Sequence, residues 1–153
     1  MSFPRNSKRS ERQGTALVEV AFVLPVFLMF MFALFEFGHV LMISNMVNAV
    51  AKQSAHYGSF EDASTADVQA YAGTKMDAIV GAGNATILIK DGSVYENTGD
   101  AEVDNLPNIE LTSAESRQIF VVEITVPYDS VAIMPPFWVN NLTLTGVSIM
   151  RRE

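Results

Sequence analysis

The chain has 153 residues and a net charge of −7, which allows one domain, or one small domain with an added segment. The acidic balance argues against a nucleic-acid partner, because an acidic domain repels polyanions. The chain has no cysteine, which excludes disulfides and thiolate catalysis. It also lacks a nucleophile elbow, an HExxH motif and a glycine-rich phosphate loop, so we expect a non-enzymatic protein without metal or cofactor.

The first fourteen residues form a short basic leader. They carry four basic residues, the last of them Arg12, against one acidic residue, whereas residues 53–150 carry thirteen acidic and three basic residues. A basic flank before an apolar helix stays in the cytoplasm, so the positive-inside rule places the N-terminus inside and the acidic part outside. The leader shows no periodic apolar pattern, and we expect residues 1–13 to be disordered.

A long apolar run follows the leader. Residues 20–35 contain no polar side chain over sixteen positions, with Glu19 and Glu36 at the two borders. A run of this length is close to the roughly 17–25 residues of a membrane-spanning helix. Apolar residues continue at helical spacing up to Val50. We therefore predict one helix over residues 15–57 that spans the membrane in its first half, with a kink at Pro25.

The leader and the apolar run also resemble a secretory signal peptide. Ordinary signal cleavage needs a small-x-small site directly after the apolar core. The best candidate is Ala49-Val50-Ala51, which lies about fourteen residues beyond Phe35. That distance disfavours removal of the segment by ordinary signal peptidase.

Residues 58–153 are predicted to form a small acidic domain. Ser64 followed by Asp67 is a helix start, and apolar residues at helical spacing follow until Gly81 and Gly83 end the helix. Three further segments read as strands: residues 85–90, 119–127 and 141–150. We also predict a tight turn at Asp91-Gly92 with a short return strand over residues 93–95, and a bulge at Gly146.

The predicted domain is therefore of the α+β class. It contains one short helix and three or four antiparallel strands, and the second half of the long helix is available as a packing partner.

Residues 14–57 resemble the TadE-like family of minor pilin-like proteins (pseudopilins) in the tight-adherence, or Flp-type, pilus systems of bacteria. The resemblance lies in Gly14, Glu19 five positions later, Pro25 within the apolar run, the Glu36-Phe37-Gly38 exit and an alanine-rich continuation. Val20 and His39 depart from it, because the family often has an aromatic residue and an arginine at these positions. The resemblance implies a pilin-like fold and a structural role in pilus assembly, adhesion or secretion.

The resemblance also implies a processing site. A membrane-bound prepilin peptidase would cut between Gly14 and Thr15 and release the leader, with the basic residues up to Arg12 holding the site at the membrane surface. Glycine suits such a site because its backbone extends easily into a protease cleft. Cleavage would leave Thr15 with a free α-amino group at the tip of the apolar helix.

Glu19 would then serve assembly. In a filament its carboxylate would pair with the Thr15 ammonium of a neighbouring subunit and fix the axial register, since breaking one partner of a buried ion pair costs about 3–5 kcal/mol. The alternative is an interfacial residue that only complements the positive start of the helix. On either reading, an ionised residue near the membrane border costs less than one at mid-bilayer.

Three other features carry weaker predictions. Glu36 and His39 lie three apart on one helix face and are interpreted as a hydrogen-bonded pair at the outer membrane interface. The alternating carboxylates of Asp100, Glu102 and Asp104 are interpreted as a solvated loop, with calcium binding as the alternative. Pro135-Pro136-Phe137-Trp138 is either an exposed contact patch or a buried hinge under the sheet, and the sequence favours neither.

The leading hypothesis is a single-pass protein of the bacterial cytoplasmic (inner) membrane, with its C-terminal domain outside and, after assembly, in the pilus. Its partners would be prepilin peptidase, other pilin or pseudopilin subunits and the assembly machinery. The alternatives are an uncleaved, signal-anchored envelope protein whose acidic domain binds a partner, and an exported protein released by ordinary signal peptidase.

Overall fold

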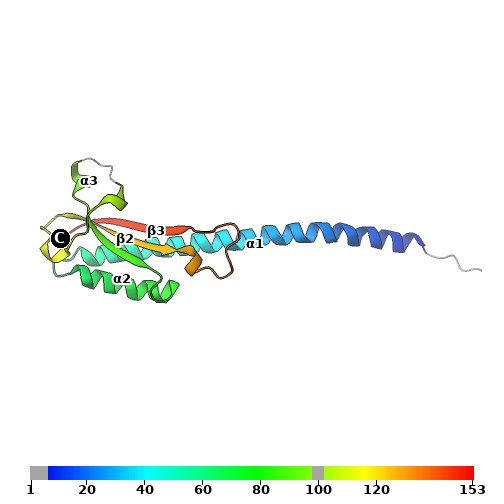
Figure 1. The fold of residues 1–153 in the computed structure, drawn as a ribbon, viewed down its shortest axis with the longest axis horizontal. Coiled ribbons are helices and arrows are strands. Elements are labelled where there is room, and N and C mark those ends of the chain that lie inside the picture. Colours follow the sequence, from blue (N-terminus) through cyan, green and yellow to red (C-terminus); the bar gives the residue numbers. More distant parts are fainter. Residues whose placement is uncertain (1–6, 98–101) are drawn as a thin grey trace, which may run out of the picture.

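The structure, a computed structural model, describes residues 7–97 and 102–153, with side chains from residue 14 onward except at position 97. Its longest element is α1 (Ser7–Gly58), a single helix of 52 residues. One end of α1 is packed into a small domain, and the other end projects from it as a rod (Figure 1). The predicted continuous helix is therefore confirmed.

The helix begins earlier than expected. α1 starts at Ser7, whereas the sequence predicted a start near Thr15, so the expectation of disorder is wrong for residues 7–13. Residues 8–13 are Lys, Arg, Ser, Glu, Arg and Gln, most of which favour helices, with no Gly or Pro among them. Extending an existing helix also avoids the nucleation cost, so these residues readily adopt the helical conformation of the rest of α1. Residues 1–6 lie outside the described part of the chain.

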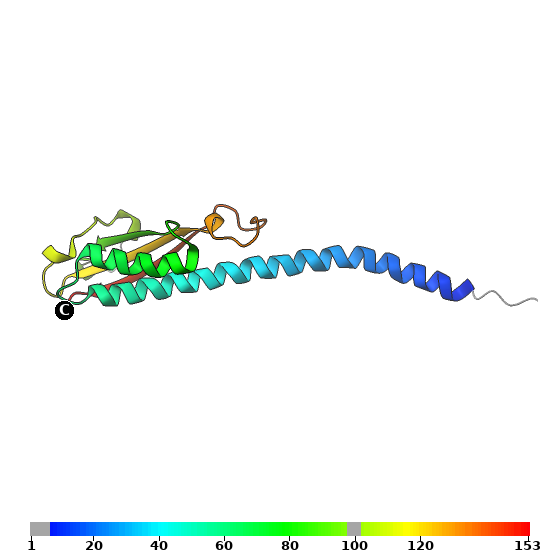
Figure 2. The same ribbon diagram turned by 90° about the horizontal axis from the view of Figure 1, so that it is seen from below.

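α1 continues through Pro25 without a break. Figure 2 shows that the helix bends gently within its blue part, the stretch that includes this residue. A proline removes one backbone hydrogen bond and crowds the preceding turn, which is the usual physical cause of such a bend.

The domain is a three-stranded antiparallel sheet with two helices on one face, as the α+β prediction required. The strands are β1 (Thr86–Asp91), β2 (Ile119–Pro127) and β3 (Thr143–Arg151), in the order β1-β2-β3. α1 packs against α2, β2 and β3, while the second helix, α2 (Thr65–Val80), also packs against β1. The second half of α1 and the whole of α2 thus cover one face of the sheet (Figure 2).

The start of α2 is confirmed in detail. Ser64 is the N-cap, its hydroxyl accepts a hydrogen bond from the Asp67 backbone N–H at 3.1 Å, and the Asp67 carboxylate accepts the Ser64 backbone N–H at 3.2 Å. Glu110 adds a second carboxylate, which accepts the Thr65 backbone N–H at 3.2 Å. These contacts satisfy backbone donors that a helix start leaves without partners.

The return strand predicted after Asp91-Gly92 is wrong. The chain leaves the sheet there and forms α3 (Val94–Asn97). The Asp91 carboxylate accepts the Ser93 backbone N–H at 2.9 Å, and the Gly92 N–H donates to the Ile119 carbonyl at 3.0 Å. The local hydrogen bond at Asp91 and the contact of Gly92 with the distant Ile119 together favour a helical turn over a second pass along β1.

The bulge predicted at Gly146 is also wrong. The β2–β3 register is unbroken from Ile119↔Arg151 to Pro127↔Thr143. Gly146 faces α1, and a Cβ there would lie 2.8 Å from Val47 Cγ1 and 2.9 Å from the Val47 carbonyl oxygen. The apolar pattern changes at this position because glycine lets β3 approach α1 closely, while Val147 and Ile149 turn to the other face.

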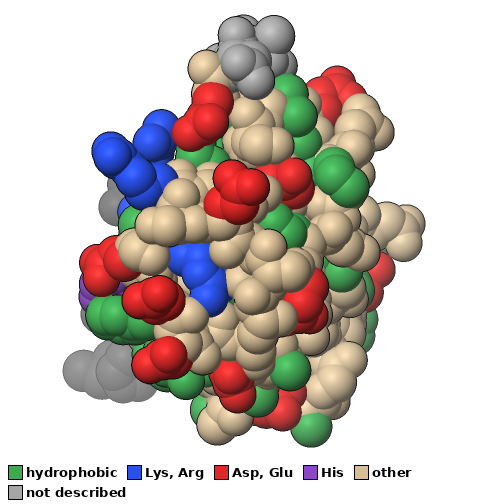
Figure 3. Space-filling view, turned by 90° about the vertical axis from the view of Figure 1, so that its left-hand side faces the viewer, with side chains coloured by type: hydrophobic (Ala, Val, Ile, Leu, Met, Phe, Trp, Pro, Cys, Tyr) green, Lys and Arg blue, Asp and Glu red, His purple; other side chains and the backbone are tan. Residues whose placement is uncertain are grey.

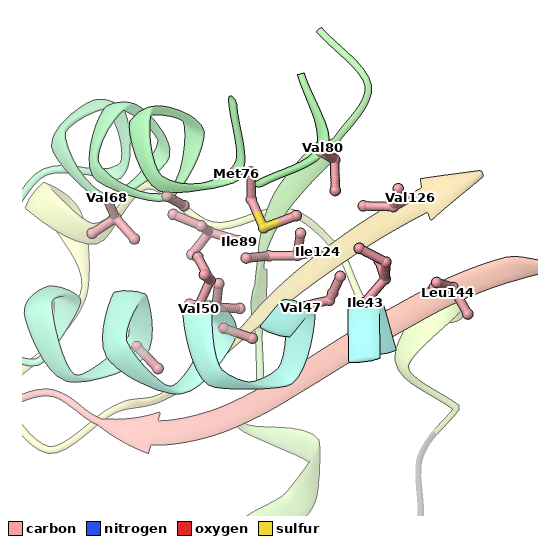
Figure 4. Packing of buried hydrophobic residues seen from close by; sticks show 14 of the residues in the cluster. Ile43, Val47, Val50, Val68, Met76, Val80, Ile89, Ile124, Val126 and Leu144 are labelled. Atoms are coloured by element: carbon pink, nitrogen blue, oxygen red, sulfur yellow. The ribbon is translucent and has the colours of Figure 1, made fainter. Parts of the chain in front are cut away.

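The core lies between the sheet and the two helices (Figure 4). α1 contributes one face of residues in its second half, and the fully buried ones include Val47, Ala51 and Ala55. α2 and β2 supply large opposing side chains, among them Met76, Phe120 and Ile124. The small alanines of α1 let its backbone approach the neighbouring elements.

Short helical turns and buried charged side chains also occur in the described part of the domain. Three short 3-10 helices, η1 (Val103–Asn105), η2 (Leu111–Ser113) and η3 (Tyr128–Ser130), lie in the connections, and the buried Lys90–Glu123 ion pair is 2.6 Å long. The Arg152 guanidinium is buried and donates to the carbonyls of Leu111 and Glu61. The end of the domain farthest from the projecting rod shows acidic side chains scattered over it (Figure 3).

Candidate functional site

The projecting half of α1, residues 14–35, is defined here as the bare half. None of its residues is buried, and its large side chains include Leu17 at 73% and Phe22 at 76% exposure. Within the described residues, α1 is the one helix that is long and apolar enough to cross a membrane. A contiguous apolar surface of this size is rare on a soluble monomer and marks a membrane or protein contact.

The predicted processing residues lie near the start of the bare half. Gly14 is exposed within α1, and apart from its chain neighbours and the adjacent helix backbone no atom lies within 4 Å of the position that a Cβ would occupy. Packing inside the chain therefore does not require glycine here, although glycine costs about 1 kcal/mol in a helix relative to alanine. Arg12 is part of the same helix, and its side chain lies outside the described residues.

Thr15 and Glu19 are four residues apart on α1, which places them on one side of the helix. Both residues are exposed. The structure thus brings the two predicted assembly residues together on one surface, next to Gly14 in sequence.

Glu36 closes the bare half and contacts the domain. Its carboxylate accepts the backbone N–H groups of Phe137, Trp138 and Val139, with Oε1 distances of 3.1, 3.2 and 2.9 Å. Only 8% of Glu36 is exposed. Three donors to one carboxylate form a charge-assisted clamp that satisfies both the anion and the backbone of the loop.

The predicted Glu36–His39 pair is wrong, because each residue contacts the domain instead. His39 Nδ1 lies 3.2 Å from the Tyr128 hydroxyl, and the two rings are 5.7 Å apart. Burial raises the pKa of the Tyr128 hydroxyl, and the negative charge of Glu36 raises it further. Tyr128 therefore stays neutral and joins the end of β2 to the exit of the bare half.

The Pro-Pro segment forms the other wall of this junction. We call residues 131–139 the junction loop; it follows η3 and lies beside α1 (Figure 1). The loop and α1 enclose a largely apolar groove of about 1180 Å³, lined among others by Phe32, Phe35, Met134 and Trp138. Phe137 is 72% exposed, so the loop is a surface patch rather than a hinge under the sheet.

The predicted acidic loop is described only in part. Asp100 lies outside the described residues, and the Glu102 carboxylate accepts the Asn105 side-chain amide at 2.9 Å. No group of three or more metal-ligating side chains occurs within residues 7–97 and 102–153.

A small α+β domain is thus carried on a helix that is long and apolar enough to cross a membrane once. This arrangement is typical of the class of membrane-anchored proteins. A family model described as TadE-like protein matches residues 14–56, which confirms the resemblance over the bare half and the packed part of α1. This match indicates a protein associated with a tight-adherence pilus system. No curated protein and no solved structure matches the chain.

Sequence reasoning missed the clamp at Glu36. A signal was present, because an acidic residue at the end of an apolar run needs a partner. Its partners are backbone N–H groups about a hundred positions away, and backbone groups leave no mark in a sequence.

Proposed function

We propose that the chain is a minor pilin-like subunit, cut by prepilin peptidase between Gly14 and Thr15 and built into a tight-adherence pilus or its assembly machinery. The observation that carries this proposal is the bare half of α1, a largely apolar stretch in which no residue is buried. A membrane before assembly and neighbouring helices after it would both cover this surface. The proposed role is structural and involves no catalysis.

Gly14 supports the processing step. The peptide bond after it lies in a helix, so a protease must first extend the backbone locally. Glycine makes that unwinding easier, and the open space around it leaves room for a protease cleft. The free amine of Thr15 would then stand one helical turn from Glu19 of its own chain and face Glu19 of a neighbour.

The helical state of Gly14 also favours the second candidate, an uncleaved anchor. A bond folded inside α1 resists proteolysis, and the chain would then keep its basic leader in the cytoplasm. Release by ordinary signal peptidase has no such support. Ala51 is fully buried within α1, and a cut there would remove Val47 from the core.

The test is the mass and N-terminal residue of the mature protein from cells that contain the peptidase. A chain beginning at Thr15 supports the proposal, and a chain that keeps Met1 supports the uncleaved anchor. Gly14→Val should abolish processing. Gly38→Val is the matched control, because Gly38 also lies in α1 with nothing within 4 Å of its Cβ position, and it should be processed normally.

Assembly is tested separately with Glu19→Gln, which keeps the size of the side chain and removes its charge. We expect normal cleavage but loss of the protein from sheared surface fibres, or of its crosslinks to other subunits. Full assembly of this variant would contradict the register role of Glu19 and leave the cleavage proposal standing.

A further inference from the structure

The junction loop presents an apolar surface to its surroundings. Four of its side chains, Ile133, Met134, Phe137 and Trp138, are 79%, 43%, 72% and 37% exposed. The loop contains no charged residue and includes two prolines. Exposed apolar side chains gathered on one loop are unusual for a surface that meets only water.

The position of the loop on α1 is equally specific. The clamp joins residues 137–139 to Glu36, the first polar residue after the sixteen-residue apolar run. A hydrocarbon core of about 30 Å corresponds to about 20 helical residues, so a span that begins near Ala16 ends near Glu36. The loop therefore lies at the level where the helix leaves the membrane, beside the end of the bare half.

The groove continues the bare half along α1, and Glu36 and His39 are the polar side chains of α1 that line it. Its α1 wall extends from Pro25 to Met42, and its loop wall includes Ile133 and Trp138. The lipid-facing surface of the helix thus runs directly under the loop. An apolar volume of about 1180 Å³ open to that surface is suited to acyl chains.

The clamp removes the usual obstacle to placing a loop at such a depth. Backbone N–H groups in an apolar environment need acceptors, and an ionised carboxylate needs donors. Glu36 and residues 137–139 satisfy one another. The tryptophan and phenylalanine beside the clamp are the residue types that concentrate at membrane–water interfaces.

We propose that the junction loop is a second membrane contact, which inserts its apolar side chains into the domain-side leaflet while acyl chains fill the groove against α1. This inference rests on the proposed membrane anchoring of α1. It goes beyond a single span, because the domain would be held against the bilayer at two points and its tilt would be fixed. The subunit would leave both contacts together when it enters a fibre.

Trp138 is the only tryptophan of the chain, so the wild-type protein reports on the loop directly. The experiment reconstitutes the full chain in vesicles of phosphatidylcholine and phosphatidylglycerol whose acyl chains carry bromine either near the headgroup or near the chain end. We expect the Trp138 emission maximum to lie at shorter wavelength than that of a tryptophan in water. We also expect the emission to be quenched more strongly by the shallow bromine than by the deep one.

Two matched variants set the scale, both with Trp138→Phe. Phe27→Trp lies in the bare half and should be quenched more by deep bromine, whereas Phe60→Trp lies beyond the end of α1 and should keep its emission. Glu36→Ala should reduce the quenching of Trp138 towards the Phe60→Trp level, because it releases the loop from α1.

Three results would overturn the inference. Quenching at Phe27→Trp without quenching at Trp138 would support the membrane span and contradict only the loop contact. Absence of quenching at both positions would contradict the proposed membrane span as well as the loop contact. A Trp138 that is shielded from bromine and acrylamide, with emission that changes when the protein is diluted in lipid, would show that a second copy covers the groove.

Discussion

The two halves of α1 belong to one unbroken helix but have opposite surroundings. In the bare half every residue is exposed or half-buried, whereas between Ile43 and Ala55 the helix buries a face that includes Val47 and Ala51. Residues 20–35 of the bare half are apolar all round, and the packed half is apolar on one face with Asn45, Asn48 and Lys52 elsewhere. A helix that is apolar all round needs an apolar environment on every side, which a small domain cannot provide.

This contrast shows that the helix serves two purposes. The packed half is part of the domain core and contributes to its stability. The bare half contributes no buried residue to that core, so its apolar sequence is suited to contact with a membrane or with other chains. The clamp at Glu36 marks the border between the two. Substitutions in α1 after Glu36 should therefore affect the stability of the domain, whereas substitutions before Glu36 should affect attachment to a membrane or to other chains.

The largest effect is expected at the closest contact of the packed half. In Gly146→Val the new side chain would overlap Val47, and β3 would have to move away from α1. We expect the free energy of unfolding to fall by about 3 kcal/mol or more. Urea unfolding of the full chain in detergent, followed by circular dichroism, measures it.

Gly73→Ala is the control for that substitution. Its Cβ would meet only Ile87 Cδ1, at 3.9 Å, within the interior of α2. Since alanine favours helix over glycine by up to about 1 kcal/mol, this variant should be as stable as the wild type or more so. Equal losses in both variants would mean that the close approach of β3 to α1 is not what requires Gly146.

The clamp should come next in size. Glu36→Ala leaves three backbone N–H groups of the junction loop without their acceptor, and a lost partner of this kind costs roughly 2–3 kcal/mol. Hydrogen exchange should therefore become much faster at Phe137, Trp138 and Val139 while the amides of β2 stay protected. Asp62→Ala, at an exposed position of the domain, should change neither. Unchanged exchange in Glu36→Ala would contradict the clamp.

Two valines of α1 test the comparison directly. Val47 is fully buried and Val26 is 65% exposed. Val47→Ala removes two buried methyl groups and should lower the free energy of unfolding by about 2 kcal/mol. Val26→Ala should change it by less than about 0.5 kcal/mol. A similar loss in both would show that the bare half also supports the folded domain.

The smallest effect is expected at the start of α2, outside both halves. The hydrogen bond from the Ser64 hydroxyl, followed by that from its backbone N–H, lowers the pKa of the Asp67 carboxyl below its ordinary value of 3.8. Its stabilising contribution is therefore present above pH 3.8 and is lost as the pH falls through the folded value.

Asp67→Asn should weaken this loss of stability in acid. Part of it should remain, because the hydrogen bond from the Thr65 backbone N–H also lowers the pKa of Glu110. Unfolding midpoints measured across the acid range for the two proteins give the comparison. Identical acid profiles would mean that the cap does not contribute through its charge.

Much of the fold could be predicted from local patterns. The apolar run, the Ser64–Asp67 cap and the β-branched residues of 119–127 each indicate their own element, because these signals depend only on neighbouring residues. The return strand after Gly92 and the bulge at Gly146 were wrong for the opposite reason. Both depended on contacts with distant elements, namely Ile119 and Val47.

The candidate site divides in the same way. Gly14, Thr15 and Glu19 could be selected from sequence because their spacing along one helix carries the hypothesis, and the structure adds that they are exposed together. The clamp and the groove could not be selected. They arise from two segments about a hundred residues apart, joined through backbone groups that are the same in every sequence.

The sequence by itself determined an apolar helix with a basic leader and an acidic α+β domain, since charge, hydropathy and period act locally. Only the tertiary structure decided where the helix stops being bare and starts being core. That border depends on which residues of the domain fold back onto α1. Here three N–H groups of the junction loop meet Glu36, and glycine at position 146 lets β3 lie against the turn of Val47.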